Sequence, residues 1–104
     1  MKAADGDTFV SLTEEGVEMT FKIINEEEKT VQVGTGSNSA SAVDVQTEGK
    51  VTIPTNVEFN GIVYNVSSIS ALAFYSCTLI TDLSIPGSVK TIEVMNIEKI
   101  IYYI

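Results

Sequence analysis

Apolar and polar residues alternate along two stretches near the start of the chain. Between residues 17 and 23 every second residue is apolar, and the same alternation returns between residues 30 and 33. A period of two is typical of a β-strand with one buried face. Residues 25–28 lie between these stretches and are one Asn and three Glu, which predicts a charged turn. The two stretches therefore predict an antiparallel hairpin.

A loop and a short strand are expected next. Residues 34–42 contain no large apolar side chain, so they predict an irregular connection. Residues 51–53 predict a strand that ends at Pro54, because proline cannot donate a hydrogen bond to a neighbouring strand. This strand is expected at an edge or an end of a sheet.

A second hairpin is predicted over residues 57–64. Its centre is Asn60-Gly61, and these two residue types accept the positive φ angles of a type I′ turn. Such a turn fixes which residues face each other across the strands. The predicted pairs are Phe59 with Ile62 and Val57 with Tyr64.

From residue 66 onward the apolar residues recur at a much longer period. Val-Ser-Ser-Ile at residues 66–69 is restated by Val-Lys-Thr-Ile at residues 89–92, 23 residues later. Residues 71–77 suit a single helical turn, and residues 80–85 suit a strand. Apolar positions fixed within such a period are typical of stacked repeats, which bury their apolar faces against one another. The predicted structural core consists of Ile69, Phe74, Cys77, Ile80, Leu83, Ile85, Val89 and Ile92.

This pattern closely resembles the BspA-like leucine-rich repeats of bacterial cell-surface proteins. The specific elements are Ala-Phe-x-x-Cys at residues 73–77 and Ile-Pro-x-Ser-Val at residues 85–89. The hairpins and the Val-x-Ile-Pro strand at residues 51–54 resemble the amino-terminal segment of such proteins. The resemblance implies a fold of the α+β class that is mostly β: a fragment of a right-handed solenoid with an amino-terminal β-hairpin cap.

The same resemblance implies a function. Family members are secreted or surface-attached proteins of host-associated anaerobic bacteria, and their solenoids serve adhesion or protein–protein contact without catalytic residues or cofactors. The implied partner is a protein ligand, for which a host extracellular protein is a candidate. No apolar export segment follows Met1, so we expect no export signal in this chain.

With 104 residues, the chain is expected to form one domain with three parts. They are a disordered start over 1–8, a β cap with two hairpins over 9–65, and repeats over 66–104. The repeats comprise one full unit and a shortened terminal unit, in which residues 97–102 restate residues 80–85 at a distance of 17. The last five residues are apolar, and an uncovered apolar strand edge tends to pair with another chain. We therefore expect a homodimer through the carboxy-terminal strand, with Ile101, Tyr102 and Tyr103 at the contact.

Charge narrows the range of partners. The chain has 14 acidic residues and 6 basic ones, all of them Lys, and its formal net charge is −8. Nucleic-acid backbones and anionic membranes require a cationic surface, so both are unexpected partners. No segment approaches the roughly 18 apolar residues of a membrane span.

The chain offers few groups for catalysis or metal binding. It contains no His and no Arg, so the usual general base and the bidentate anion clamp are both absent. Cys77 is either a nucleophile or a packing residue, and no basic residue lies near it in sequence to activate it. The carboxylates at residues 5–7 and 26–28 do not supply the ligand positions of a calcium loop. We therefore predict no catalytic, cofactor or metal site.

Two further hypotheses remain, one about the tyrosines and one about the fold. Tyrosine supplies contact area at low entropic cost, so Tyr64, Tyr75, Tyr102 and Tyr103 are candidates for a recognition face. The favoured alternative is a packing role, in which Tyr64 covers the hairpin and Tyr102 occupies a core strand position. The alternative to the solenoid is an all-β sandwich, an accessory glycan- or protein-binding module of an extracellular enzyme. The two folds differ in one pairing. A solenoid sets the strand at residues 83–85 parallel to the strand at residues 100–102, whereas a sandwich pairs them antiparallel.

Overall fold

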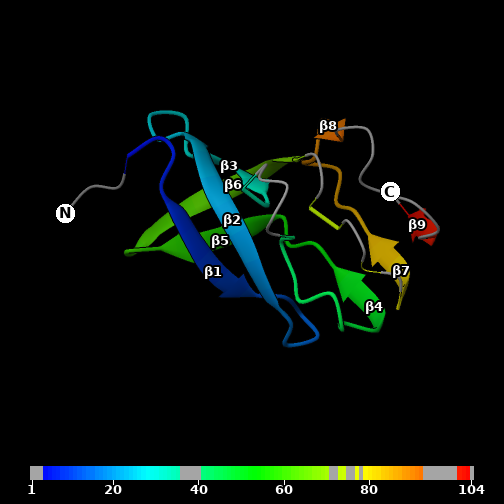
Figure 1. Cartoon of the computed structure of the whole chain (residues 1–104). Helices are drawn as coiled ribbons and strands as arrows, with labels where there is room; N and C mark the ends of the chain where they lie inside the picture. Colours follow the sequence, from blue (N-terminus) through cyan, green and yellow to red (C-terminus); the bar gives the residue numbers. More distant parts are fainter. Residues whose placement is uncertain are drawn as a thin grey trace.

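The computed structural model describes residues 4–35, 41–70, 73–74, 77, 79–92 and 101–103, which form two β-sheets (Figure 1). The larger sheet contains β1 (Thr8–Leu12), β2 (Glu18–Asn25), β3 (Thr30–Val33), β5 (Asn56–Phe59), β6 (Ile62–Ile69) and β8 (Thr91–Ile92). The smaller sheet contains β4 (Gly49–Thr52), β7 (Ile80–Ser84) and β9 (Ile101–Tyr103). The protein is therefore mostly β, as predicted, and no helix occurs within the described ranges.

Both predicted hairpins are confirmed. β2 and β3 pair antiparallel, and β5 and β6 pair antiparallel in the expected register. Phe59 faces Ile62 and Val57 faces Tyr64. Asn60 and Gly61 have φ angles of 54° and 77°, as a type I′ turn requires.

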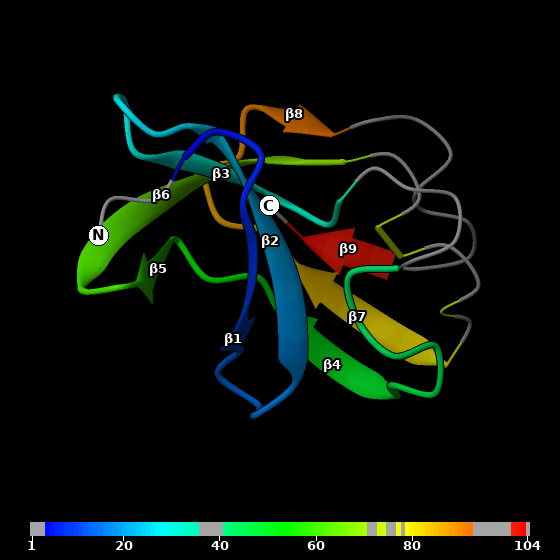
Figure 2. The same ribbon diagram turned by 60° about the vertical axis from the view of Figure 1, so that its left-hand side comes forward.

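The remaining pairings run parallel and form two ladders. In the larger sheet β3 pairs with β6 and β6 with β8, while in the smaller sheet β4 pairs with β7 and β7 with β9. After β3, the chain alternates between the two sheets (Figure 2). β4 lies in the smaller sheet, the β5–β6 hairpin in the larger, β7 in the smaller, β8 in the larger and β9 in the smaller. The pairing of Ile69 with Ile92 reproduces the 23-residue spacing found in the sequence.

The larger sheet curls until its first and last strands approach each other. Phe9 on β1 stacks on Phe59 of β5, with ring centroids 4.4 Å apart and an interplanar angle of 5°. The centroid of the Phe9 ring also lies 5.7 Å from the ring centroid of Phe21 and 6.1 Å from that of Tyr64. Stacked rings of this kind add to the stability that their burial provides.

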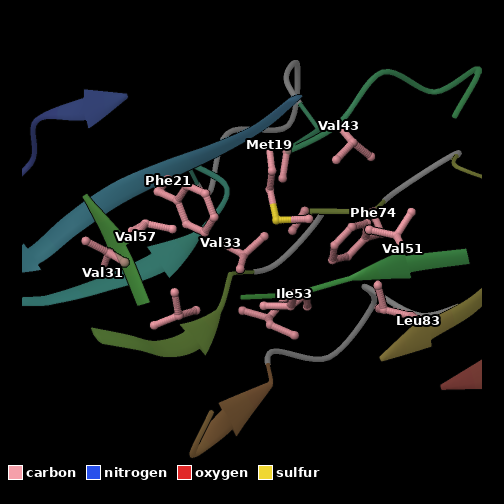
Figure 3. Packing of buried hydrophobic residues seen from close by; sticks show 14 of the residues in the cluster. Met19, Phe21, Val31, Val33, Val43, Val51, Ile53, Val57, Phe74 and Leu83 are labelled. Atoms are coloured by element: carbon pink, nitrogen blue, oxygen red, sulfur yellow. The ribbon is translucent and has the colours of Figure 1, made fainter. Parts of the chain in front are cut away.

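A single apolar core joins the two sheets. Figure 3 shows Met19, Phe21 and Val33 from the larger sheet in the same cluster as Phe74 and Leu83. The predicted core residues Ile69, Phe74, Cys77, Ile80, Leu83 and Ile85 are buried, and Val89 and Ile92 are partly buried against them. The predicted boundary between residues 65 and 66 falls inside β6, so cap and repeat share one strand.

The structure corrects the expectation for the start of the chain. Strand β1 was not predicted, because Val10 and Leu12 face outward and hide the alternation. Of the segment expected to be disordered, residues 1–8, the structure describes positions 4–8, and β1 begins at residue 8. Before it, Gly6 N–H donates to Ile23 O at 2.8 Å, and Glu26 N–H donates to Asp5 Oδ1 at 2.7 Å.

Two further predictions concern the repeat. Ala73 and Phe74 lie in a turn, and Cys77 N–H donates to Phe74 O at 3.1 Å. The other positions of the predicted helical turn (71, 72, 75 and 76) fall outside the described residues. The 17-residue match would place Leu83 beside residue 100, whereas Leu83 pairs with Tyr102. A shift of two positions keeps the same face of the strand inward, so the sequence pattern alone cannot distinguish the two registers.

Candidate functional site

The strongest candidate site is a groove on the outward side of β1 and β2, which we call the β2 groove. Its volume is about 630 Å³. This is within the roughly 300–1,000 Å³ of typical ligand pockets. It is lined by Val10, Val17, Glu18, Thr20, Ser41, Ala42, Val43, Asp44, Thr47 and Glu48.

Strands β1 and β2 form one side of the groove. Along β2, Met19 and Phe21 point into the core, so Glu18 and Thr20 must point outward. Val10 is the cross-strand partner of Thr20 and is 57 % exposed. This side of the groove therefore offers an apolar contact next to polar and charged groups.

Residues 41–48 form the opposite wall, and backbone hydrogen bonds fix its position. Thr20 N–H donates to Ala42 O at 2.8 Å, and Ala42 N–H donates to Ala73 O at 2.6 Å. Asp44 shapes the following turn, since its Oδ1 accepts from Gln46 N–H at 2.8 Å and its carbonyl accepts from Thr47 N–H at 2.9 Å. The wall is thus tied to the larger sheet before the chain enters β4 (Figure 2).

The β2 groove is acidic. Glu18, Asp44 and Glu48 line it, and none of the described lining residues is basic. Within the described ranges the one ion pair joins Lys29 to Glu26, so no lysine described there neutralises these three carboxylates. They do not converge on a point either, because no three acidic, His or Cys side chains among the described residues are placed to hold a metal ion. The groove therefore suits a ligand with separated positive charges and some apolar surface.

Cys77 is buried close to this wall. Burial raises the pKa of the Cys77 thiol, a hydrogen bond with Ser41 opposes the rise, and the charge of Asp44 adds to it. A buried thiol with a raised pKa is a poor nucleophile. Its position is that of a packing residue beneath residues 41–44.

A buried polar cluster lies at the other end of β2. Glu26 is buried, although residues 26–28 were expected to form a solvated turn. Its Oε2 accepts a hydrogen bond from the Tyr64 hydroxyl, and its Oε1 pairs with Lys29 Nζ. Burial raises the pKa of Tyr64 to about 12, and the hydrogen bond to Glu26 and the charges of Glu26 and Asp7 act in the same direction. Glu26 and Tyr64 are buried, whereas the Lys29 side chain is 40 % exposed, and the cluster holds the β2–β3 turn against β6.

The predicted tyrosine face is not assembled by the described residues. Tyr64 is fully buried and cannot contact a partner. Tyr75 lies outside the described residues. Ile101, Tyr102 and Tyr103 form β9, whose backbone pairs with β7 and whose side chains lie outside the description.

The sequence did not reveal the β2 groove. Its lining comes from two segments more than 20 positions apart, residues 10–20 and 41–48, which the Thr20–Ala42 hydrogen bond and the shared apolar core bring together. No local signal marked it, because the strand that places Val10 in the lining was itself not predicted.

Comparison with known proteins gives no relative for this chain. No protein-family model, no curated protein and no solved structure matches it. Among the described residues, no helix is long and apolar enough to cross a membrane.

Proposed function

We propose that this chain is a non-enzymatic binding module of a secreted or cell-surface bacterial protein. In this proposal a β-hairpin cap precedes BspA-like leucine-rich repeats wound as a right-handed solenoid, and the module mediates protein–protein contact. The observation that carries the proposal is the pair of parallel ladders, β3–β6–β8 and β4–β7–β9. In repeat proteins each unit adds strands beside those of the preceding unit.

The β6–β8 register and the direction of β9 support a repeat over a sandwich. Ser68 pairs with Thr91 and Ile69 with Ile92, so the strands that meet are the ones that the sequence restates. β7 and β9 run parallel, whereas the sandwich alternative requires antiparallel strands at this place. The smaller sheet therefore favours the repeat-based module.

The chemistry of the described residues supports binding rather than catalysis. The β2 groove holds carboxylates and hydroxyls but no nucleophile activated by a base. Cys77 is buried, and its raised pKa disfavours the reactive thiolate. Repeat surfaces bind through extended contact areas, which this groove and the exposed Val10 and Leu12 would supply.

Self-association through β9 is part of the same proposal. β9 is the last strand in the order β4-β7-β9 of the smaller sheet. A further repeat, or the same strand of a second copy, would cover its outer edge.

Binding to immobilised extracellular proteins tests the proposed function. The biotinylated chain is measured by biolayer interferometry against purified extracellular-matrix and plasma proteins at about 150 mM salt. An unrelated β-protein with the same net charge serves as the control. We expect saturable binding to at least one protein that the control does not bind. Binding to none of them, or equal binding by the control, would contradict the proposal.

A further inference from the structure

We propose that the β2 groove binds an extended segment of a partner protein in which Lys or Arg alternates with small apolar residues. This inference rests on the proposed function, since it names the partner chemistry of a binding module. Three observations lead to it: the distribution of charge in the groove, the exposed apolar side chain beside that charge, and the rigidity of both walls.

The carboxylates of the β2 groove are separated, which favours a ligand with several separated positive charges. Glu18 lies on one wall, whereas Asp44 and Glu48 lie on the other. They neither pair with a described lysine nor gather around one point where a metal ion would fit. Cationic side chains spaced along a segment can approach Asp44 and Glu48, and the charge of Glu18 together with the net charge of −8 would attract such a segment from a distance.

The apolar part of the groove calls for small uncharged side chains between those cations. Val10 is 57 % exposed on the β1–β2 wall, whereas Val17 packs partly against the core. Side chains of an extended segment point alternately to opposite sides. A segment with alternating cationic and apolar residues can therefore turn its apolar side chains toward Val10 while its cationic side chains reach Asp44 and Glu48 on the opposite wall.

Both walls are held in place before any partner binds. The β1–β2 pairing fixes Val10 opposite Thr20, and the Thr20–Ala42 and Ala42–Ala73 hydrogen bonds fix the opposite wall. A preformed site loses little conformational entropy on binding, so even modest contacts contribute to affinity.

Peptide titration tests the proposal. The probe is a capped peptide of alternating Lys and Val, added to the ¹⁵N-labelled chain at 50 and at 150 mM salt. The comparison probes are the same peptide with Glu in place of Lys, the same peptide with Ser in place of Val, and spermidine. We expect shifted amide signals at residues 10, 17–20 and 41–48, tightest binding by the Lys-Val peptide, and weaker binding at higher salt.

Matched variants decide whether the groove is responsible. Glu18→Gln, Asp44→Asn and Glu48→Gln are combined in one chain, and Glu27→Gln, Glu28→Gln and Glu58→Gln in another. The two triple variants lose equal charge, but the second set is exposed and lies outside the groove. The first set removes all three carboxylate charges of the groove and should weaken binding about tenfold. The second set should leave it nearly unchanged. Val10→Thr should weaken the Lys-Val peptide but not the Lys-Ser peptide.

The outcomes separate this inference from the proposed function. Equal loss in both triple variants, equal affinity for spermidine, or binding of the Glu-Val peptide would overturn the inference. If the Lys-Val peptide does not bind but the chain still binds an extracellular protein, the inference fails and the proposed function stands. If neither binds, both fail.

Discussion

Gly34 is the residue at which backbone geometry restricts the sequence most. Its φ angle is +84°, and a Cβ atom there would lie 2.7 Å from Ser70 Oγ and 3.0 Å from Ala73 Cβ. Ser70 cannot readily move, because its Oγ donates to Val33 O at 2.7 Å. The close approach lets the chain leave β3 directly beside Ser70 and Ala73.

Gly34→Ala should therefore destabilise the fold. Strained backbone conformations cost roughly 1–3 kcal/mol, and the contact with Ser70 adds to that cost. Gly87→Ala is the control, since a Cβ atom at Gly87 would meet nothing within 4 Å and its φ angle is not strained. Urea unfolding of both variants measures the difference. Equal urea midpoints for the two variants would show that Gly34 does not lie close to Ser70 in the folded chain.

Tyr64 should ionise only at very high pH. Burial first, then the hydrogen bond and charge of Glu26, raise the pKa of its hydroxyl to about 12 from the ordinary value of 10.0. The pKa of Tyr64 is higher in the folded chain than in the unfolded chain. Its contribution to folding stability is therefore complete below pH 10 and declines as the pH rises toward 12. In an absorbance titration at 295 nm, the folded chain should show a step near pH 12 that Tyr64→Phe removes.

The same substitution should lower stability at neutral pH. Phenylalanine would leave the buried Glu26 carboxylate without the hydroxyl donor, which costs roughly 1–3 kcal/mol. Unchanged stability together with a retained step near pH 12 would mean that Tyr64 is not the buried partner of Glu26.

At the scale of elements, the turn between β1 and β2 covers the outer edge of β4. Glu15 Oε1 accepts from Thr52 N–H at 2.9 Å, and its Oε2 accepts from Thr52 Oγ1 at 2.5 Å. Ile53 N–H, by contrast, donates to Ser84 O of β7. The carboxylate thus occupies a donor on the side of β4 that faces away from the ladder, where an uncovered edge would invite pairing.

This contact should make stability depend on pH. Burial would raise the pKa of Glu15, but the hydrogen bonds from Thr52 outweigh it and the net shift is downward from 4.5. A lowered folded-state pKa means that the stabilisation is present above the ordinary carboxyl pKa and is lost as pH falls through the folded-state value. Glu15→Gln should therefore be less stable than the natural chain at pH 7, and the difference should shrink at pH 3. Glu14→Gln, a change at an exposed neighbour, should show no such trend in urea unfolding.

Local sequence patterns predict some of these elements and miss others. The β2–β3 and β5–β6 hairpins were predictable because alternation and the Asn60-Gly61 turn are local signals. β1 was missed because its outward positions are apolar. The β2 groove and the buried position of Glu26 depend on contacts between distant segments, such as Glu26 with Tyr64, which no local pattern encodes.

At the scale of the whole molecule, the segments expected to form a cap and a repeat share one body. β6 pairs with β3 and with β8, and one apolar core extends from Phe9 to Ile85. In the proposed solenoid the cap would therefore be the first layer rather than a separate unit. Its hairpin covers one end of the smaller sheet through Glu15, and β9 lies at the other end.

Strand direction in the smaller sheet is the most direct test of this architecture. Nuclear Overhauser contacts between backbone protons report the relative direction of β7 and β9. They are measured on the uniformly ¹³C,¹⁵N-labelled chain. Parallel ladders predict contacts of Leu83 with Tyr102 and of Ser84 with Tyr103, together with contacts of Ile69 with Ile92. Antiparallel contacts between residues 82–84 and 101–103, or none between them, would contradict the stacked arrangement and the repeat-based function with it.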